Sequence, residues 1–182
     1  MAMNEQTIII FDTETTGLPQ PDAVPLSRQP QVIEFGAVVV ERGQCVLEVS
    51  ELFDPQTKLP EVITKITGIV DADLAGKRTF AQFLPELTEL FRSADVLIAH
   101  NAQFDKTMLQ LELARLQCED FPWPKRTVCT AQEFHVLMGY RPRLVDAYLY
   151  FTGNKLQQTH RALDDAQALF ACCAASGLLE VL

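Results

Sequence analysis

The sequence has no apolar run long enough to cross a bilayer and no leading segment typical of secretion. A membrane-spanning helix needs about 20 consecutive, mostly apolar residues, and charged or polar residues interrupt every apolar run before that length. Residues 1–6 contain neither a basic stretch nor an apolar core. We therefore expect a cytoplasmic protein with no membrane partner.

Cysteine is scarce and has no recognisable spacing. The chain holds 5 cysteines, an odd number, and two of them, Cys172 and Cys173, are adjacent. Adjacent residues on a helix point in different directions, and no set of Cys and His has the ligand spacing of a structural zinc site. We therefore expect reduced thiols and no disulfide framework.

Basic residues are also few, with 15 Lys and Arg against 24 Asp and Glu and a net charge of −9. A protein that holds duplex nucleic acid tightly by its own charge is usually basic. Two interpretations remain open. Part of the negative charge forms a site that bound cations neutralise, or the substrate is short or single-stranded and is held locally by a few basic residues. Candidates for such local contacts are Lys125, Arg126, Arg141, Arg143, Lys155 and Arg161.

The length of 182 residues and the 48% hydrophobic content suit one domain with a core. A tight turn at residues 42–44 joins two apolar, β-branched runs, which predicts an antiparallel meander. The later segments alternate between short apolar runs and helical periodicity, which predicts an α/β fold with a mixed sheet flanked by helices. The expected strands cover residues 7–11, 31–41, 45–53, 95–99 and 126–130, and the expected helices cover residues 60–66, 79–91, 101–117, 130–138, 143–151 and 163–175.

Three short blocks contain the residues that suggest chemistry. They are FDTETTGL at residues 11–18, HNAQFD at residues 100–105, and HRALDDA at residues 160–166. In the first block, Asp12 and Glu14 lie two residues apart, so their side chains point to the same side of a strand. Gly17, just beyond them, permits a tight backbone that a ligand can approach closely.

Each of the other two blocks places an aspartate in the first turn of an expected helix. Asp105 follows Asn101, the expected N-cap, by four residues, and Asp165 follows His160 by five. An acid in a first turn also stabilises the helix dipole, so either residue alone could be structural. Asp164 is an alternative to Asp165, because adjacent helical residues diverge by about 100°. For His100 we expect an orienting hydrogen-bonding role.

Together the blocks predict a hydrolytic metal site. Carboxylates gathered in one place repel one another and raise each other's pKa, and divalent cations relieve that repulsion. Metal-assisted hydrolysis of a phosphodiester is the natural chemistry for such a site. A histidine on the loop before the last acid can take a proton from the attacking water.

The three blocks resemble the motifs of the DEDDh 3′–5′ exonucleases, which are DnaQ-like proteins and include the proofreading epsilon subunit of bacterial DNA polymerase III. The similarity covers roughly residues 7–176. His160 lies five residues before Asp165, whereas the tyrosine variant of the family has Tyr four residues before it, where this chain has Arg161. The resemblance implies a ribonuclease H-like fold with a central five-stranded mixed sheet, and a single exonuclease domain over residues 1–182.

The same resemblance implies two Mg²⁺ or Mn²⁺ ions and a role for each motif residue. Asp12 would bridge both ions, Glu14 and Asp165 would complete the tighter site, Asp105 would support the second, and His160 would be the general base. Relatives often carry His-Gly-Ile where this chain has Thr67-Gly68-Ile69, which alters the expected stacking of the terminal base. The expected substrate contacts are Thr15, Gly17, Leu18, Ile66, Thr67, Asn101 and Phe104.

The expected function is a metal-dependent 3′–5′ exonuclease that releases nucleoside 5′-monophosphates from the 3′ end of DNA, in proofreading or repair. Its expected partner is a nucleic acid 3′ end, single-stranded DNA first, with a DNA polymerase as a candidate protein partner. One alternative is a 3′–5′ exoribonuclease that trims short or single-stranded RNA. Another is a non-catalytic nucleic-acid-binding module on the same fold, which predicts loss of at least one acid, and none is missing.

Overall fold

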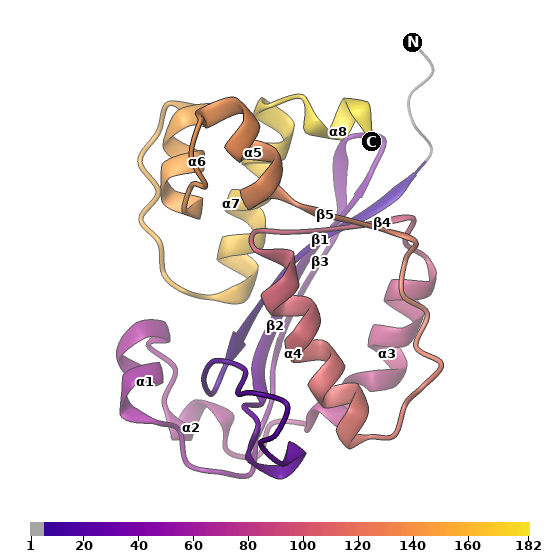
Figure 1. The fold of residues 1–182 in the computed structure, drawn as a ribbon, viewed down its shortest axis with the longest axis vertical. Helices are drawn as coiled ribbons and strands as arrows, with labels where there is room; N and C mark the ends of the chain where they lie inside the picture. Colours follow the sequence, from indigo (N-terminus) through magenta and orange to yellow (C-terminus); the bar gives the residue numbers. More distant parts are fainter. Residues whose placement is uncertain (1–5) are drawn as a thin grey trace.

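A five-stranded mixed sheet forms the centre of the molecule in the computed structural model, which describes residues 6–182 (Figure 1). The strand order is β3-β2-β1-β4-β5. The first three strands, β1 (Thr7–Thr15), β2 (Val32–Glu41) and β3 (Gln44–Leu52), form the predicted antiparallel meander. The other two, β4 (Val96–Ala99) and β5 (Arg126–Cys129), add in parallel beside β1.

Helices cover both faces of this sheet. Two of them, α3 (Phe80–Arg92) and α4 (Ala102–Arg115), lie on one face, to the right in Figure 1. The opposite face is covered by α5 (Thr130–Met138), α6 (Leu144–Thr152), α7 (Ala162–Ala175) and the short α8 (Leu178–Val181). Three short helices complete the chain: η1 (Leu26–Arg28), α1 (Glu61–Thr67) and α2 (Asp71–Leu74).

The alternation of side chains along β1 divides the core into two layers. Ile9 and Phe11 pack toward α3 and α4, while Ile8 and Ile10 pack toward α7. Because side chains two residues apart share a face, Asp12 continues the set that faces α7. The central strand therefore carries apolar residues into both layers and an acidic residue beyond them.

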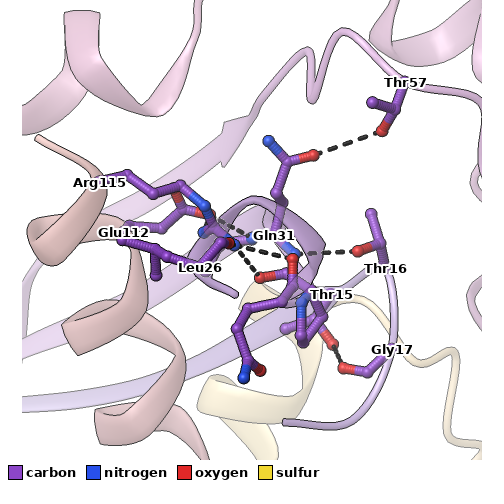
Figure 2. A network of polar contacts seen from close by, with 11 residues as sticks. Thr15, Thr16, Gly17, Leu26, Gln31, Thr57, Glu112 and Arg115 are labelled. Atoms are coloured by element: carbon purple, nitrogen blue, oxygen red, sulfur yellow. Dashed lines mark hydrogen bonds and ion pairs between the residues drawn. The ribbon is translucent and has the colours of Figure 1, made fainter. Parts of the chain in front are cut away.

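The loop of residues 16–31, which follows β1, is fastened to the end of α4 (Figure 2). Arg115 donates from Nη2 to three loop carbonyls, those of Leu26, Gln29 and Pro30, the last two at 2.8 Å. The buried Glu112 carboxylate accepts a hydrogen bond from the Val32 amide at 2.9 Å and contacts Arg115. These bonds hold the last part of the loop, and the Gln31 amide donates to the Thr16 hydroxyl at 2.9 Å, which ties the residue before Gly17 to that part.

The predicted α/β fold with a five-stranded mixed sheet is confirmed, and two local features differ from expectation. β1 runs to Thr15, well past the expected end, because it pairs with β2 along its whole length. Asn101 is the N-cap residue of α4, as expected, but its side chain makes no capping hydrogen bond: its φ is 75°, and its side-chain oxygen accepts a hydrogen bond from Arg141 instead. The helix expected over residues 79–91 is confirmed as α3, which begins at Phe80 and contains Pro85.

The short helices α2 and α8 were not expected from the sequence. All five cysteines are free. Among residues 6–182, no helix has the length and apolar character needed to cross a membrane.

Candidate active site

The candidate site lies where β1 extends beyond its parallel neighbour β4. The two strands pair only along Ile8–Ile10, whereas β1 continues to Thr15. Beyond the end of β4, the Asp105 carboxylate from α4 pairs with this open edge. Its Oδ1 accepts hydrogen bonds from the backbone N–H of Thr13 at 3.1 Å and from the Thr13 hydroxyl at 2.8 Å. The carboxylate of Asp105 therefore lies beside the part of β1 that carries Asp12 and Glu14.

The third block reaches the same place from α7 and the segment before it. Glu14, His160 and Asp165 each offer a ligand atom, and these atoms all lie within 4.8 Å of one another. The Gln158 amide donates to Asp165 Oδ2 at 2.8 Å, which orients that carboxylate. Asp164 is exposed and accepts from the Thr159 hydroxyl instead, so Asp165 is the residue of the pair that belongs to the cluster.

A glycine in β2 allows α7 to approach this closely. Gly36 is the register partner of Asp12. A Cβ atom added to Gly36 would lie 2.1 Å from the backbone nitrogen of Leu163, a distance that real Cβ atoms essentially never show. The missing side chain therefore lets the first turn of α7 rest directly on β2 beside Asp12.

An ion pair between β2 and the start of α7 strengthens this contact. Glu34 is 1% exposed and lies directly opposite Glu14 in the sheet. Arg161 binds its carboxylate through Nε and Nη2, the shortest contact being 2.7 Å, and the Ala162 amide donates to it at 3.1 Å. A buried carboxylate facing another acid needs such a partner, and here the partner follows His160 directly.

The acids in this cluster have strongly perturbed pKa values. Burial raises the pKa of Asp12 well above its usual range, and Asp105, Glu14 and other nearby acids raise it further. Burial, followed by repulsion from Asp165 and Glu34, raises the pKa of Glu14 to about 8. The pKa of Asp165 is raised mainly by burial. The acids therefore cannot all be ionised at neutral pH without added positive charge.

The donor set suits a hard divalent cation. Carboxylate oxygens are the ligands that Mg²⁺ and Mn²⁺ prefer, and an imidazole nitrogen lies among them. A divalent ion here would remove the repulsion that raises these pKa values. The side chains that could hold it are those of Asp12, Glu14, Asp105 and Asp165.

His100 connects three segments that surround the site. Its Nε2 lies 3.0 Å from the carbonyl oxygen of Pro142, and its Nδ1 lies 3.0 Å from the Thr130 hydroxyl. Since a carbonyl only accepts, Nε2 carries the proton, and in the neutral ring Nδ1 is the acceptor that faces the Thr130 hydroxyl, which also donates to the Ala99 carbonyl at 3.4 Å. Burial lowers the pKa of His100, which favours this neutral form. The contacts agree with the orienting role expected from the sequence.

All five predicted catalytic residues line one cavity of about 630 Å³. Two predicted substrate contacts, Asn101 and Phe104, line it as well. Residues in its wall that the sequence did not single out as site residues include Thr13, Gln158 and Pro142. The cavity has an acidic floor, from β1, α4 and α7, and a rim that includes the segment between α5 and α6.

The other predicted substrate contacts lie outside that lining. The Thr15 hydroxyl donates to the Gly17 carbonyl at 2.8 Å, as Figure 2 shows, and the Thr67 hydroxyl donates to the Ile63 carbonyl at 3.0 Å. Both threonines are buried, so their hydroxyls serve the fold. Leu18 and Ile66, in contrast, are exposed apolar side chains.

Sequence reasoning missed the residues that hold the cluster together: Glu34, Gly36 and Gln158. The signals were faint. An acid and a glycine inside an apolar strand are both unusual, but neither pattern shows what the residue will face. Gln158 lies in an irregular segment, where the sequence gives no sign of its partner.

The sequence is similar to those of known exonucleases and DNA polymerase III proteins. A family profile described as "Exonuclease" (RNase_T) matches residues 9–172. The DNA polymerase III subunit epsilon of Treponema pallidum is 34% identical over 161 residues, which cover 86% of this chain and 70% of that protein. The "DNA polymerase III PolC-type" protein of Thermotoga maritima is 33% identical over 164 residues, which cover 90% of this chain and 11% of that protein. The chain thus spans about a tenth of the PolC-type relative.

Solved structures share the fold. The nuclease domain of 3′hExo, described as a DEDDh family member bound to rAMP, has a TM-score of 0.75 at 16% identity, covering 93% of this chain and 90% of that one. Exonuclease X in complex with 5′ overhanging duplex DNA has a TM-score of 0.67 at 23% identity, covering 92% and 89%. The family profile and the epsilon relative show family membership as well as fold. The chain belongs to the exonuclease family, as its resemblance to the DEDDh exonucleases predicted.

Proposed function

We propose that this exonuclease is metal-dependent, acts in the 3′–5′ direction on DNA, and releases nucleoside 5′-monophosphates during proofreading or repair. The observation that carries the proposal is the convergence of Glu14, His160 and Asp165, whose ligand atoms lie within 4.8 Å of one another. Asp12 and Asp105 line the same cavity. Membership of the exonuclease family supports the hydrolysis of nucleic acid ends, and the acidic cluster supports a need for divalent cations.

The four acids are the proposed ligands of two Mg²⁺ or Mn²⁺ ions. When bound, such ions would acidify the attacking water and neutralise the charge that develops at phosphorus and at the departing 3′ oxygen. Asp12 and Glu14 offer their carboxylates from β1, while Asp105 and Asp165 offer theirs from α4 and α7. Thr13 and Gln158 fix the orientation of the two helix-borne acids through hydrogen bonds, so the ligand set is largely preorganised.

His160 is the proposed general base. It lies on the segment just before α7, with a left-handed φ of 53°, and its imidazole is close to both Glu14 and Asp165. An imidazole in this position accepts the proton of the attacking water at its free nitrogen. The neighbouring carboxylates stabilise the imidazolium ion that results.

The terminal nucleotide is proposed to contact a small set of residues around the acids. Asn101 and Phe104 line the cavity itself. Leu18 and Ile66 are exposed apolar side chains, suited to pack against a base. Thr15, Gly17 and Thr67 would contribute through their backbone, since the two hydroxyls are already bonded internally.

DNA is the proposed substrate because the relatives that are about a third identical are named as DNA polymerase III proteins. The same names make a DNA polymerase the proposed partner. A single-stranded 3′ end suits a protein with a net charge of −9, because such an end needs few phosphate contacts. RNA stays the second candidate, since 3′hExo shares the fold and its structure holds rAMP.

The test uses single-stranded DNA, mismatched duplex DNA and single-stranded RNA, each labelled at either end, with Mg²⁺ or with EDTA. We expect a 3′ label to leave at once as a mononucleotide and a 5′-labelled strand to shorten stepwise, with no cleavage in EDTA. Early release of a 5′ mononucleotide would show the opposite polarity. Binding without any hydrolysis, by wild type and by Asp12→Ala alike, would favour the non-catalytic alternative.

A further inference from the structure

The segment between α5 and α6 forms part of the rim of the active-site cavity, and it is firmly anchored. Its Pro142 carbonyl lies 3.0 Å from His100 Nε2. Arg141 and Arg143, on either side of Pro142, are both exposed, and both line the same cavity as the catalytic acids. A backbone contact to His100, the residue after β4, thus places two cationic side chains at the edge of an acidic site.

The two arginines differ in what already binds them. The Asp146 carboxylate binds Arg143 through two hydrogen bonds, at 2.9 and 3.0 Å. Arg141 instead donates to the neutral side-chain oxygen of Asn101 at 2.5 Å. Within residues 6–182, no carboxylate lies in ion-pair range of Arg141. Arg141 therefore presents an uncompensated positive charge, oriented by Asn101, at the rim of the cavity.

We propose that Arg141 binds a backbone phosphate of the retained nucleic acid strand, on the 5′ side of the bond that is cut. This inference rests on the proposed 3′–5′ exonuclease function. The scissile phosphate has to lie over the buried acids, and a 3′-terminal nucleotide has no further phosphate beyond it. Any second phosphate near the cavity therefore belongs to the strand that remains. A guanidinium at the rim suits it, because Arg binds phosphate oxygens through directed hydrogen bonds.

Charge explains why a single residue can matter here. The protein as a whole has a net charge of −9, so the surface at large repels a nucleic acid strand. Attraction has to come from bound cations and from local basic groups that are not already neutralised. Among the two rim arginines, only Arg141 meets that condition, since Asp146 offsets Arg143.

The first test measures steady-state cleavage of a single-stranded oligodeoxynucleotide by Arg141→Ala and Arg141→Lys. We expect Arg141→Ala to raise KM about threefold to tenfold with little change in kcat, and Arg141→Lys to recover part of the loss. The salt dependence of binding should weaken by about one phosphate contact. Arg92→Ala is the matched control, because Arg92 is exposed on α3, pairs with Glu89 and lies outside the cavity lining.

The second arm uses the p-nitrophenyl ester of thymidine 5′-monophosphate, which has one phosphodiester and no retained strand. We expect Arg141→Ala to hydrolyse this ester as fast as wild type does. An equal loss on the ester and the oligonucleotide would place Arg141 at the scissile phosphate and overturn the assignment. An unchanged KM for the oligonucleotide would overturn it too.

A binding arm separates this inference from the proposed function. The anisotropy of a fluorescent oligodeoxynucleotide is measured with Ca²⁺ as the cation, for wild type, Arg141→Ala and Arg143→Ala. We expect Arg141→Ala to weaken binding more than Arg143→Ala does, because Asp146 already neutralises Arg143. If the wild type hydrolyses nothing, the exonuclease proposal fails, and the anisotropy still decides whether Arg141 binds the strand. Equal affinities of all three proteins would reject the phosphate contact.

Discussion

The folded protein disfavours the ionised form of the Glu14 carboxyl group. Burial and the nearby Asp165 and Glu34 raise its pKa from 4.5 to about 8. Between these two pH values the folded protein binds a proton at Glu14 that the unfolded chain has released. The contribution of this group to stability is therefore complete below about pH 4.5 and is lost as pH rises through about 8.

The thermal stability of the metal-free protein should report this directly. In EDTA we expect the melting temperature to fall as pH rises from about 5 to 8, because ionised Glu14 is penalised only in the folded state. Glu14→Gln, which cannot ionise, should show a shallower decline. Saturating Mg²⁺ should also flatten the curve, since the cation compensates the charge. A melting temperature that rises steadily over this pH range would contradict the assigned environment.

His160 offers a second test at the scale of one side chain. We expect His160→Ala to lower kcat by about a hundredfold to ten-thousandfold while the melting temperature and its response to Mg²⁺ persist. The reason is that the four acids, and not the imidazole, are the proposed cation ligands. His135→Ala is the control, because His135 is exposed on α5 and lies outside the cavity lining. A variant at His160 that cleaves at the wild-type rate would remove His160 from the mechanism.

At the scale of elements, the site depends on how closely α7 packs on β2. Gly36→Ala would place a Cβ 2.1 Å from the Leu163 backbone nitrogen, so the first turn of α7 has to move. We expect a loss of about 1 to 3 kcal/mol in the free energy of unfolding and a larger proportional loss of activity, because Asp165 and His160 shift together. Denaturant unfolding and cleavage assays would measure the two effects.

The control for that substitution is Gly17→Ala, judged by stability alone. A Cβ at Gly17 would meet only the Cβ of Pro30, at 3.9 Å, which is an ordinary contact. We therefore expect no loss in the free energy of unfolding, because an alanine that fits the native backbone only restricts the unfolded chain. Equal destabilisation by both substitutions would indicate that the contact with α7 does not explain the effect at Gly36.

The same packing explains what the sequence could and could not predict. Local patterns mark the strands, the helices and the acidic residues, so the sheet and the candidate acids could be predicted from the sequence. The contacts of Glu34 and Gly36 depend on which residues of β1 and α7 they face. That register is fixed by tertiary packing across more than a hundred residues, and no local pattern encodes it. The missing side-chain cap at Asn101 has a related reason. Its αL backbone and its hydrogen bond with Arg141, 40 residues away, take the place of the usual capping bond.

At the scale of the whole molecule, the gathered acids oppose stability in the absence of cations. We expect Asp12→Asn to raise the melting temperature of the metal-free protein, because it removes one of the repelling charges. Each kcal/mol of repulsion removed corresponds to about 2 to 4 °C. We also expect this substitution to abolish cleavage. Its melting temperature should no longer respond to Mg²⁺. The wild type should gain about 2.7 kcal/mol at a Mg²⁺ concentration a hundred times its Kd. Such an exchange of stability for activity is common at functional sites.

Scanning calorimetry of both proteins, with EDTA and with a Mg²⁺ series, checks this expectation. Lys65, exposed on α1 near Glu61, supplies a control, since Lys65→Ala alters surface charge without touching the acids. An Asp12→Asn protein that is less stable than wild type in EDTA would mean that Asp12 supports the fold through contacts other than charge.

Because Asp12 and Glu14 lie on β1, the two sides of the site differ in how easily they open. Asp12 and Glu14 belong to the middle strand of the sheet, whereas His160 sits on an irregular stretch next to side-chain bonds from Gln158 and Thr159. Local opening frees such stretches far more readily than central strands. Amide exchange should therefore be faster around His160 than at Asp12 and Glu14, so the histidine can leave its position while the strand that carries the two acids stays paired.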